Sequence, residues 1–122
     1  MAALKSYRDL EVWRRSIDWA ERIYRVSRNW PPEEKYGLTG QVRRAAVSVA
    51  ANIAEGAART GTGEFLQFLS VASGSLAEVE TFLILVGRLE YLADADRATL
   101  EAEAEEIGRM LSGLKRSLRS KH

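Results

Sequence analysis

The sequence predicts an all-α fold, an up-down-up-down antiparallel four-helix bundle that forms a single domain over residues 1–122. Three observations support this prediction. Apolar residues recur at helical spacing in four segments of similar length, short stretches with proline, glycine or aspartate separate these segments, and no segment shows the alternation of a strand. Short links between such helices favour antiparallel neighbours. The expected helices cover about residues 9–29, 39–58, 63–90 and 97–119.

The first expected helix carries two adjacent apolar stripes, which is more than a helix at the surface of one domain needs. One stripe comprises Leu10, Trp13, Ile17, Ala20, Tyr24 and Ser27. The other comprises Val12, Ser16, Trp19, Ile23, Val26 and Trp30. We expect one stripe to fill the core and the other, with Trp19 and Trp30, to form an interface. Pro31 and Pro32 end the helix, and residues 1–8 are expected to form a loosely held arm.

The second expected helix has one face of mostly small apolar residues. Thr39 is the expected N-cap, because its hydroxyl can accept a hydrogen bond from an unpaired amide of the first turn. The apolar face comprises Val42, Ala45, Ala46, Val49, Ala50, Ile53 and Ala54. These small side chains favour close approach of a neighbouring helix. Gly56 suits the left-handed conformation that ends a helix, and the alternative is that the helix continues one turn to Arg59. Asn52 borders the apolar face, where an amide that needs partners can fix helix register.

The third expected helix, which Thr62 or Thr60 would cap, also has surplus apolar residues. Its inner face comprises Phe65, Leu69, Ala72, Leu76, Val79, Phe82 or Leu83, Val86 and Leu89. A second apolar row comprises Leu66, Phe68, Val71 and Leu85. Gly74 lies mid-helix, where glycine costs about 1 kcal/mol relative to alanine. Close contact with another helix explains this glycine best, and a notch for a ligand is the alternative.

The fourth expected helix, which Asp94 or Asp96 would cap, has a regular seam with alternating spacings of four and three. The seam comprises Leu100, Ala104, Ile107, Leu111, Leu114 and Leu118. The first half of this helix is acidic and the last part is basic. That order matches the helix dipole, so a solvated outer face accounts for it without a functional role.

The chain shows no constellation for catalysis, a metal or a cofactor, so we expect a protein that is not an enzyme. There are no cysteines, and the one histidine is His122 at the C-terminus. Inward-facing Glu-x-x-His pairs and phosphate-binding glycine loops are missing. Glu78 and Glu80 point in different directions on a helix, which favours a structural ion pair, for example with Arg43 or Arg44, or an interface role.

The chain shows neither a long apolar run nor a signal-peptide core, so a cytoplasmic location without a membrane partner is expected. The net charge of +1 hides an uneven distribution. Residues 1–63 carry 11 Lys and Arg against 7 Asp and Glu, a net charge of +4; residues 64–106 carry 2 against 10, or −8; and residues 107–122 carry 5 against none. Such polarity suits nucleic-acid binding, and it suits subunits that pair a basic face with an acidic one.

Arginine makes up 14 of the 18 basic residues, and its fork-shaped side chain suits phosphate and carboxylate recognition. Arg43 and Arg44 are adjacent and project about 100° apart on the helix. They are expected to serve assembly first and nucleic acid second. The predicted nucleic-acid-binding residues are Arg14, Arg15, Arg43, Arg44, Arg59, Lys115, Arg116 and Arg119.

Three ordered motifs resemble one known family. They are YRDLEVW at residues 7–13, YGLTGQVRRAAVSVAANIAEG at 36–56, and EFLQFLSVASGSLAEVET at 64–81. The chain resembles the bacterial four-helix bundle proteins encoded within 23S ribosomal RNA intervening sequences. That family is similar to the accessory variability determinant of diversity-generating retroelements, whose members bind nucleic acid and a reverse transcriptase.

The resemblance implies a homopentameric ring, which would bury the surplus apolar stripes through a heterologous interface. The expected interface residues are Trp19, Trp30, Phe68, Val71 and Leu85. Two functions follow as hypotheses. The first is a non-catalytic oligomeric scaffold that binds RNA or DNA through basic surfaces. The alternative is a protein-interaction adaptor, for example for a reverse transcriptase, with no direct role in nucleic-acid binding.

Overall fold

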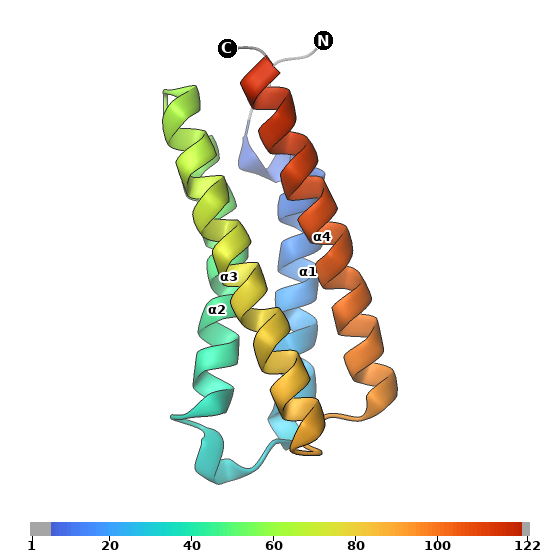
Figure 1. Ribbon diagram of the computed structural model, residues 1–122. Helices are drawn as coiled ribbons and strands as arrows, with labels where there is room; N and C mark the ends of the chain where they lie inside the picture. The colour runs from blue at the N-terminus through green and yellow to red at the C-terminus, as the bar shows by residue number, and fades with distance from the viewer. Residues whose placement is uncertain (1–5, 121–122) are drawn as a thin grey trace.

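The computed structural model describes residues 6–120 and folds as a bundle of four α-helices, with no strand in this range (Figure 1). Consecutive helices run in opposite directions, as predicted. The helices are α1 (Glu11–Val26), α2 (Leu38–Ala57), α3 (Thr62–Arg88) and α4 (Asp94–Ser120). Short 3-10 helices cover Tyr7–Asp9, Ser27–Asn29 and Pro32–Glu34. Residues 1–5 of the expected arm, together with Lys121 and His122, lie outside the described residues.

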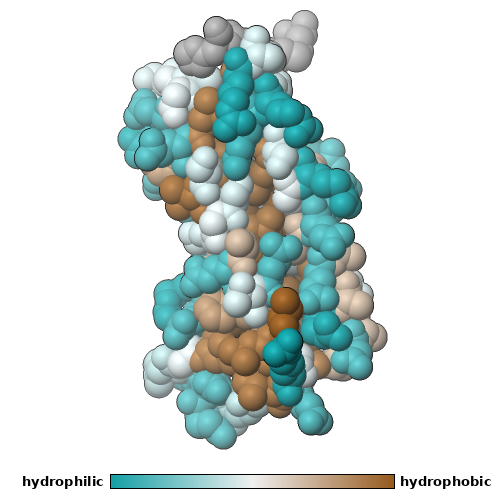
Figure 2. Space-filling view, in the orientation of Figure 1, coloured by the Kyte–Doolittle hydropathy of each residue, from teal (hydrophilic) through white to brown (hydrophobic). Residues whose placement is uncertain are grey.

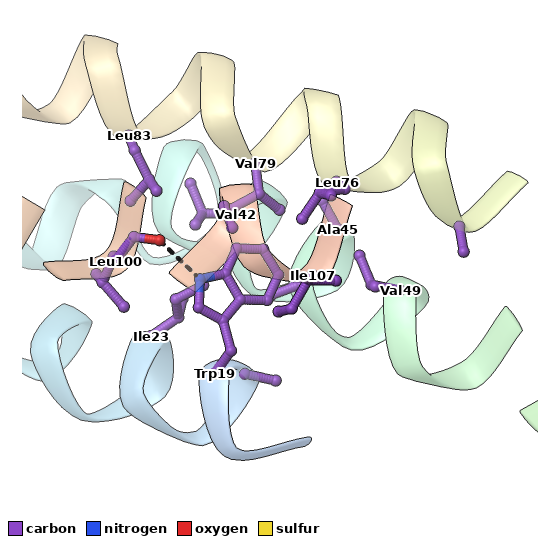
Figure 3. Packing of buried hydrophobic residues seen from close by; sticks show 14 of the residues in the cluster. Trp19, Ile23, Val42, Ala45, Val49, Leu76, Val79, Leu83, Leu100 and Ile107 are labelled. Atoms are coloured by element: carbon purple, nitrogen blue, oxygen red, sulfur yellow. Dashed lines mark hydrogen bonds between the residues drawn. The ribbon is translucent and has the colours of Figure 1, made fainter. Parts of the chain in front are cut away.

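The core lies along the bundle axis, and all four helices contribute to it. Trp19 of α1 is fully buried, and its Nε1 donates a hydrogen bond to the carbonyl oxygen of Leu100 in α4 at 3.1 Å. Figure 3 shows the indole among side chains such as Val42, Val79 and Ile107. Burying an aromatic ring of this size contributes about 3–5 kcal/mol to stability.

The two apolar stripes of α1 correct one prediction. Trp19 and Trp30, expected at an interface, are 0% and 4% exposed and belong to the core. The other stripe is the more exposed one, since Ile17 and Tyr24 retain 41% and 42% of their accessible surface. Helical spacing grouped the side chains only in part, because Ala20 and Ser27 of that stripe are also buried. It did not determine which group the other three helices cover.

Gly56 does not end α2 in a left-handed conformation, and the helix continues to Ala57, close to the expected range of 39–58. Gly56 lies within the helix, and no glycine among residues 6–120 has a positive φ. A Cβ at this position would lie 2.8 Å from Cβ of Phe68 and 2.9 Å from Cδ1 of Phe65. Gly56 is therefore required for the close approach of α3 to α2, where the small residues of α2 had predicted a near neighbour.

The predicted helix caps also differ from the structure. Gly37 is the N-cap of α2, and Thr39 lies inside the first turn with its buried Oγ1 lacking a hydrogen-bond partner. The carboxylate of Glu34 accepts a hydrogen bond from the backbone N–H of Leu38 at 3.2 Å. Likewise Gly61, rather than a threonine, is the N-cap of α3. The expected threonine hydroxyls therefore do not cap α2 or α3, and at α2 a glutamate carboxylate accepts a backbone N–H of the first turn instead.

By length and composition alone, α3 is apolar enough to cross a membrane, which contrasts with the sequence-based expectation. Its inner face, which includes Leu69, Val79 and Leu83, packs into the bundle. Core helices of soluble proteins meet the same criterion. Only 33% of its most apolar stretch is buried within this chain, however, so α3 leaves much apolar surface uncovered.

Candidate nucleic-acid and assembly interfaces

The end of the bundle where the described chain begins and ends also carries the α2–α3 turn (Figure 1). Arg59 lies in that turn, and Arg116 and Arg119 lie in the last turns of α4. Arg116 and Arg119 are exposed and have no ion pair among the described residues. Among the predicted basic residues, Arg44 on α2 is likewise exposed without an ion pair in this range, and Arg116 and Arg119 are the two such residues at this end of the bundle.

Two neighbours at this end are partly engaged within the chain. The Arg59 guanidinium lies 4.9 Å above the Phe68 ring and 3.9 Å from the Glu55 carboxylate. Lys115 Nζ donates a hydrogen bond to Ser73 Oγ at 2.7 Å. The Arg59–Glu55 pair is exposed and weak enough to exchange for a phosphate, whereas the Lys115–Ser73 bond is partly buried.

On α1, Arg14 and Arg15 extend this basic surface along the bundle. Arg14 Nη1 donates to the carbonyl oxygen of Arg8 at 2.7 Å, which ties α1 to the preceding 3-10 helix. Arg15 lies 3.4 Å from the Glu11 carboxylate, with both side chains about half exposed. Each residue therefore retains solvent-facing donors while it makes a local contact.

Arg43 and Arg44 lie toward the other end of the bundle, near the start of α2. Arg43 Nε donates to Ser27 Oγ at 2.8 Å, and its guanidinium lies 4.8 Å above the Tyr24 ring. These contacts join α2 to α1. Arg44 lines a groove between α2 and α3 that Glu78 also lines, but the two side chains form no ion pair. The predicted pairing of these arginines with Glu78 or Glu80 is absent within the described chain.

Glu80 lies where α3 faces α4. A groove there is lined by Leu76, Glu80, Ala104, Glu105, Gly108, Arg109, Ser112 and Arg116. Partial burial raises the pKa of Glu80, and the nearby carboxylates of Glu105 and Glu101 raise it further. The groove is thus acidic around Glu80 and basic toward Arg116.

Asn52 belongs to a polar bridge between α2 and α3. Its Nδ2 donates to the Ser48 carbonyl oxygen at 2.8 Å and to Ser48 Oγ at 2.9 Å. Ser75 Oγ of α3 donates to the same Ser48 Oγ at 3.0 Å. Only the Ser75–Ser48 bond joins the two helices, because both Asn52 bonds lie within α2. The register role predicted for Asn52 therefore stays a prediction. Gly74, next to Ser75, contacts no other helix, because a Cβ there would meet nothing within 4 Å.

The remaining predicted interface residues lie at or near the surface. Phe68 is half-buried beside Gly56, while Val71 and Leu85 are 48% and 42% exposed. Leu89, predicted on the inner face of the third helix, is 45% exposed at the C-cap of α3. Sequence reasoning missed Ile84, which is exposed on α3, and Val47, which is exposed on α2. The sequence could have indicated Ile84 and Val47, because both are large apolar residues on helix faces where polar residues are expected.

These residues form two exposed apolar surfaces. The α1–α2 patch comprises Ile17, Tyr24 and Val47, and the α3 patch comprises Val71, Ile84, Leu85 and Leu89. Figure 2 shows hydrophobic surface over the lower part of α3. Within residues 6–120 no group of three or more metal-ligating side chains occurs.

Comparison with known proteins places the chain in a family. The family model described as 23S rRNA-intervening sequence protein matches residues 8–113. A solved structure from Bacteroides thetaiotaomicron, described as a protein with unknown function from the S23 ribosomal protein family, is 25% identical and superposes with a TM-score of 0.80. The alignment covers 86% of this chain and 95% of that chain. The search of curated proteins gives no significant match. Because the matched region spans nearly all of the bundle, this chain belongs to the 23S rRNA-intervening sequence protein family.

Proposed function

We propose that this protein is a non-catalytic, cytoplasmic scaffold that assembles as an oligomer and binds nucleic acid. The observation that carries the proposal is the exposed basic end of the bundle, where Arg116 and Arg119 have no ion-pair partner within the described residues. Arginine donates two parallel hydrogen bonds to a phosphate, and such contacts dominate nucleic-acid affinity. Lys115 and Arg59 lie toward the same end of the bundle and add to its positive charge.

The assembly we propose is a homopentameric ring. A net charge of +1 gives one chain little attraction for a polyanion. A ring with rotational symmetry repeats the basic end of each copy on one side, so the local positive charge multiplies while the acidic surfaces lie elsewhere. The exposed apolar patches support association, because single-chain soluble proteins rarely leave several large side chains exposed together.

The test is a salt titration of binding to structured RNA, single-stranded DNA and double-stranded DNA. The double variant Arg116→Gln, Arg119→Gln should weaken binding at low salt. On a duplex, it should also reduce the slope of log affinity against log salt by about 0.9 for each phosphate that the protein no longer neutralises. Arg109→Gln is the matched control, because Arg109 lies on the same helix and pairs with Glu106 at 2.7 Å. No binding at low salt, or equal effects of the two variants, contradicts the proposal.

A protein-interaction adaptor is the second candidate function, and the α3 patch favours it. Four large apolar side chains remain exposed on one helix that carries few charges. A protein such as a reverse transcriptase would cover them without any contribution from the basic end. Affinity capture from the native host distinguishes the two functions. Retention of one protein by wild type, its loss with Leu85→Glu, and retention after nuclease treatment support the adaptor.

A further inference from the structure

Two arginine side chains lie on aromatic rings at the basic end of the bundle. Cζ of Arg8 lies 5.2 Å from the centroid of the Tyr7 ring. Cζ of Arg59 lies 4.9 Å from the centroid of the Phe68 ring. The 3-10 helix Tyr7–Asp9 and the α2–α3 turn both lie toward the end of the bundle where α4 ends (Figure 1). Both arginines are exposed and both rings are partly exposed, so cations and aromatic faces occur together at this surface.

The Tyr7 ring is held in place by its neighbours. Its centroid lies 5.0 Å from that of the Trp13 ring, at an interplanar angle of 69°, and Trp13 packs against the core. The Tyr7 carbonyl oxygen accepts a hydrogen bond from the backbone N–H of Leu10 at 3.0 Å. The next carbonyl oxygen, that of Arg8, accepts one from Arg14 Nη1 at 2.7 Å. The ring is therefore ordered before any ligand arrives, and little side-chain entropy is lost when a flat group stacks on it.

An arginine that lies on an aromatic ring suits an unpaired base. The flat face of a base stacks on an aromatic ring or on a guanidinium plane, and the adjacent phosphate attracts the same guanidinium. Bases of a duplex are already stacked on one another, so a duplex offers these side chains mainly its phosphates. Arg116 and Arg119 at the same end add positive charge for the backbone of a bound strand.

We propose that the basic end of the bundle binds single-stranded nucleic acid, with unpaired bases stacked on the two arginine–aromatic pairs. This proposal rests on the nucleic-acid binding proposed above and names the class of nucleic acid. Phosphate contacts supply attraction that any strand shares, and stacking adds a part that only accessible bases provide. Every base has a flat π face, so little preference for a particular sequence is expected.

A similar pair at the opposite end of the bundle provides a matched control. Nζ of Lys35 lies 5.3 Å from the centroid of the Tyr36 ring, and Tyr36 is 88% exposed. Glu33 and Glu34 lie just before this pair in the chain, and their carboxylates oppose an approaching phosphate. Tyr36 is more exposed than Tyr7. An effect that occurs at Tyr7 and not at Tyr36 therefore does not come from exposed aromatic surface in general.

The test compares two single-stranded DNA oligonucleotides of equal length and charge, one complete and one with abasic sites in its central part. By fluorescence anisotropy at low salt, wild type should bind the complete strand at least about fivefold more tightly. Tyr7→Leu should reduce this preference and leave the affinity for the abasic strand unchanged, because the charge of the protein is unchanged. Tyr7→Phe keeps a ring and should keep the preference, and Tyr36→Leu should match wild type.

Four outcomes decide against stacking. Equal binding of the two strands by wild type overturns it without any variant, and this comparison decides the matter if Tyr7→Leu fails to fold by circular dichroism. Equal losses in Tyr7→Leu and Tyr36→Leu overturn the assignment to the basic end. A loss of preference in Tyr7→Phe shows that the ring is not the contact. Absence of binding to either strand at low salt removes the proposed nucleic-acid binding itself, whereas equal binding of both strands leaves it standing on charge alone.

Discussion

The helices α3 and α4 are each 27 residues long and pack in the same bundle, yet their outer faces differ. Eleven charged residues lie on α4, and Arg97 and Arg109 pair with acidic residues three or four positions away. Only four charged residues lie on α3, and none of them forms an ion pair within the described chain. The outer face of α4 is therefore rich in charged side chains, whereas that of α3 has few charges and exposes large apolar side chains such as Val71 and Leu85.

The largest expected effect separates the inner and outer faces of α3. Leu83→Ala removes a fully buried side chain and should lower the free energy of unfolding by about 2–5 kcal/mol. Leu85→Ala, two residues further on, should change the stability of the single chain by only about 0.5 kcal/mol. Urea unfolding at low protein concentration measures both. Similar losses at the two positions mean that the outer face is packed within the chain.

A smaller loss is expected where α2 and α3 approach most closely. Gly56→Ala places a Cβ 2.8 Å from Phe68 Cβ, so the helices must move apart. Overpacking of this kind costs about 1–3 kcal/mol. Thermal unfolding followed by circular dichroism should show a lower Tm. An unchanged Tm contradicts the assignment of Gly56 to a close helix contact.

The opposite sign is expected for a glycine on the outer face of α3. Gly74→Ala meets no atom within 4 Å, and alanine favours helix over glycine by about 1 kcal/mol. The single chain should therefore become more stable by up to that amount, measured in the same unfolding assay. If stability falls, Gly74 has a role that the single chain does not reveal.

The smallest expected effect concerns Glu80, where α3 meets the acidic part of α4. Burial and the neighbouring carboxylates raise the pKa of Glu80 in the folded chain above its ordinary value of 4.5. Folding is therefore disfavoured as pH rises and Glu80 ionises. Glu80→Gln should be more stable than wild type at pH 7, and the gain should vanish below pH 4.5. Denaturant unfolding across this pH range checks the trend, and a gain independent of pH refutes it.

Apolar periodicity predicted the four helices and their antiparallel order because a helix groups residues every three or four positions regardless of its neighbours. It failed for α1, where two stripes were equally apolar. Trp19 lies in the core because the Leu100 carbonyl oxygen of α4 accepts a hydrogen bond from its indole N–H, and because the other three helices leave room for the ring. Gly56 was misassigned for a related reason, since only the position of Phe68 shows that its missing side chain matters.

The candidate site was predictable in composition and less so in arrangement. The sequence identified the basic residues, but the fold assigns them different surroundings. Arg43 is engaged by Tyr24 and Ser27, whereas Arg116 and Arg119 stay exposed at the opposite end. Sequence order gives no sign of this division, because it depends on which side chains of other helices lie within reach.

The hydrogen bond from Trp19 to Leu100 joins residues 81 positions apart, and this separation has a consequence for biosynthesis. Neighbouring helices such as α2 and α3 can pair as soon as both have left the ribosome. The inner side of α1 must wait for α4, which is made last, and contacts between distant segments form late. A nascent chain that stalls before Leu100 therefore leaves the tryptophan of α1 uncovered on the side that α4 closes, and chaperones and proteases recognise such apolar surface.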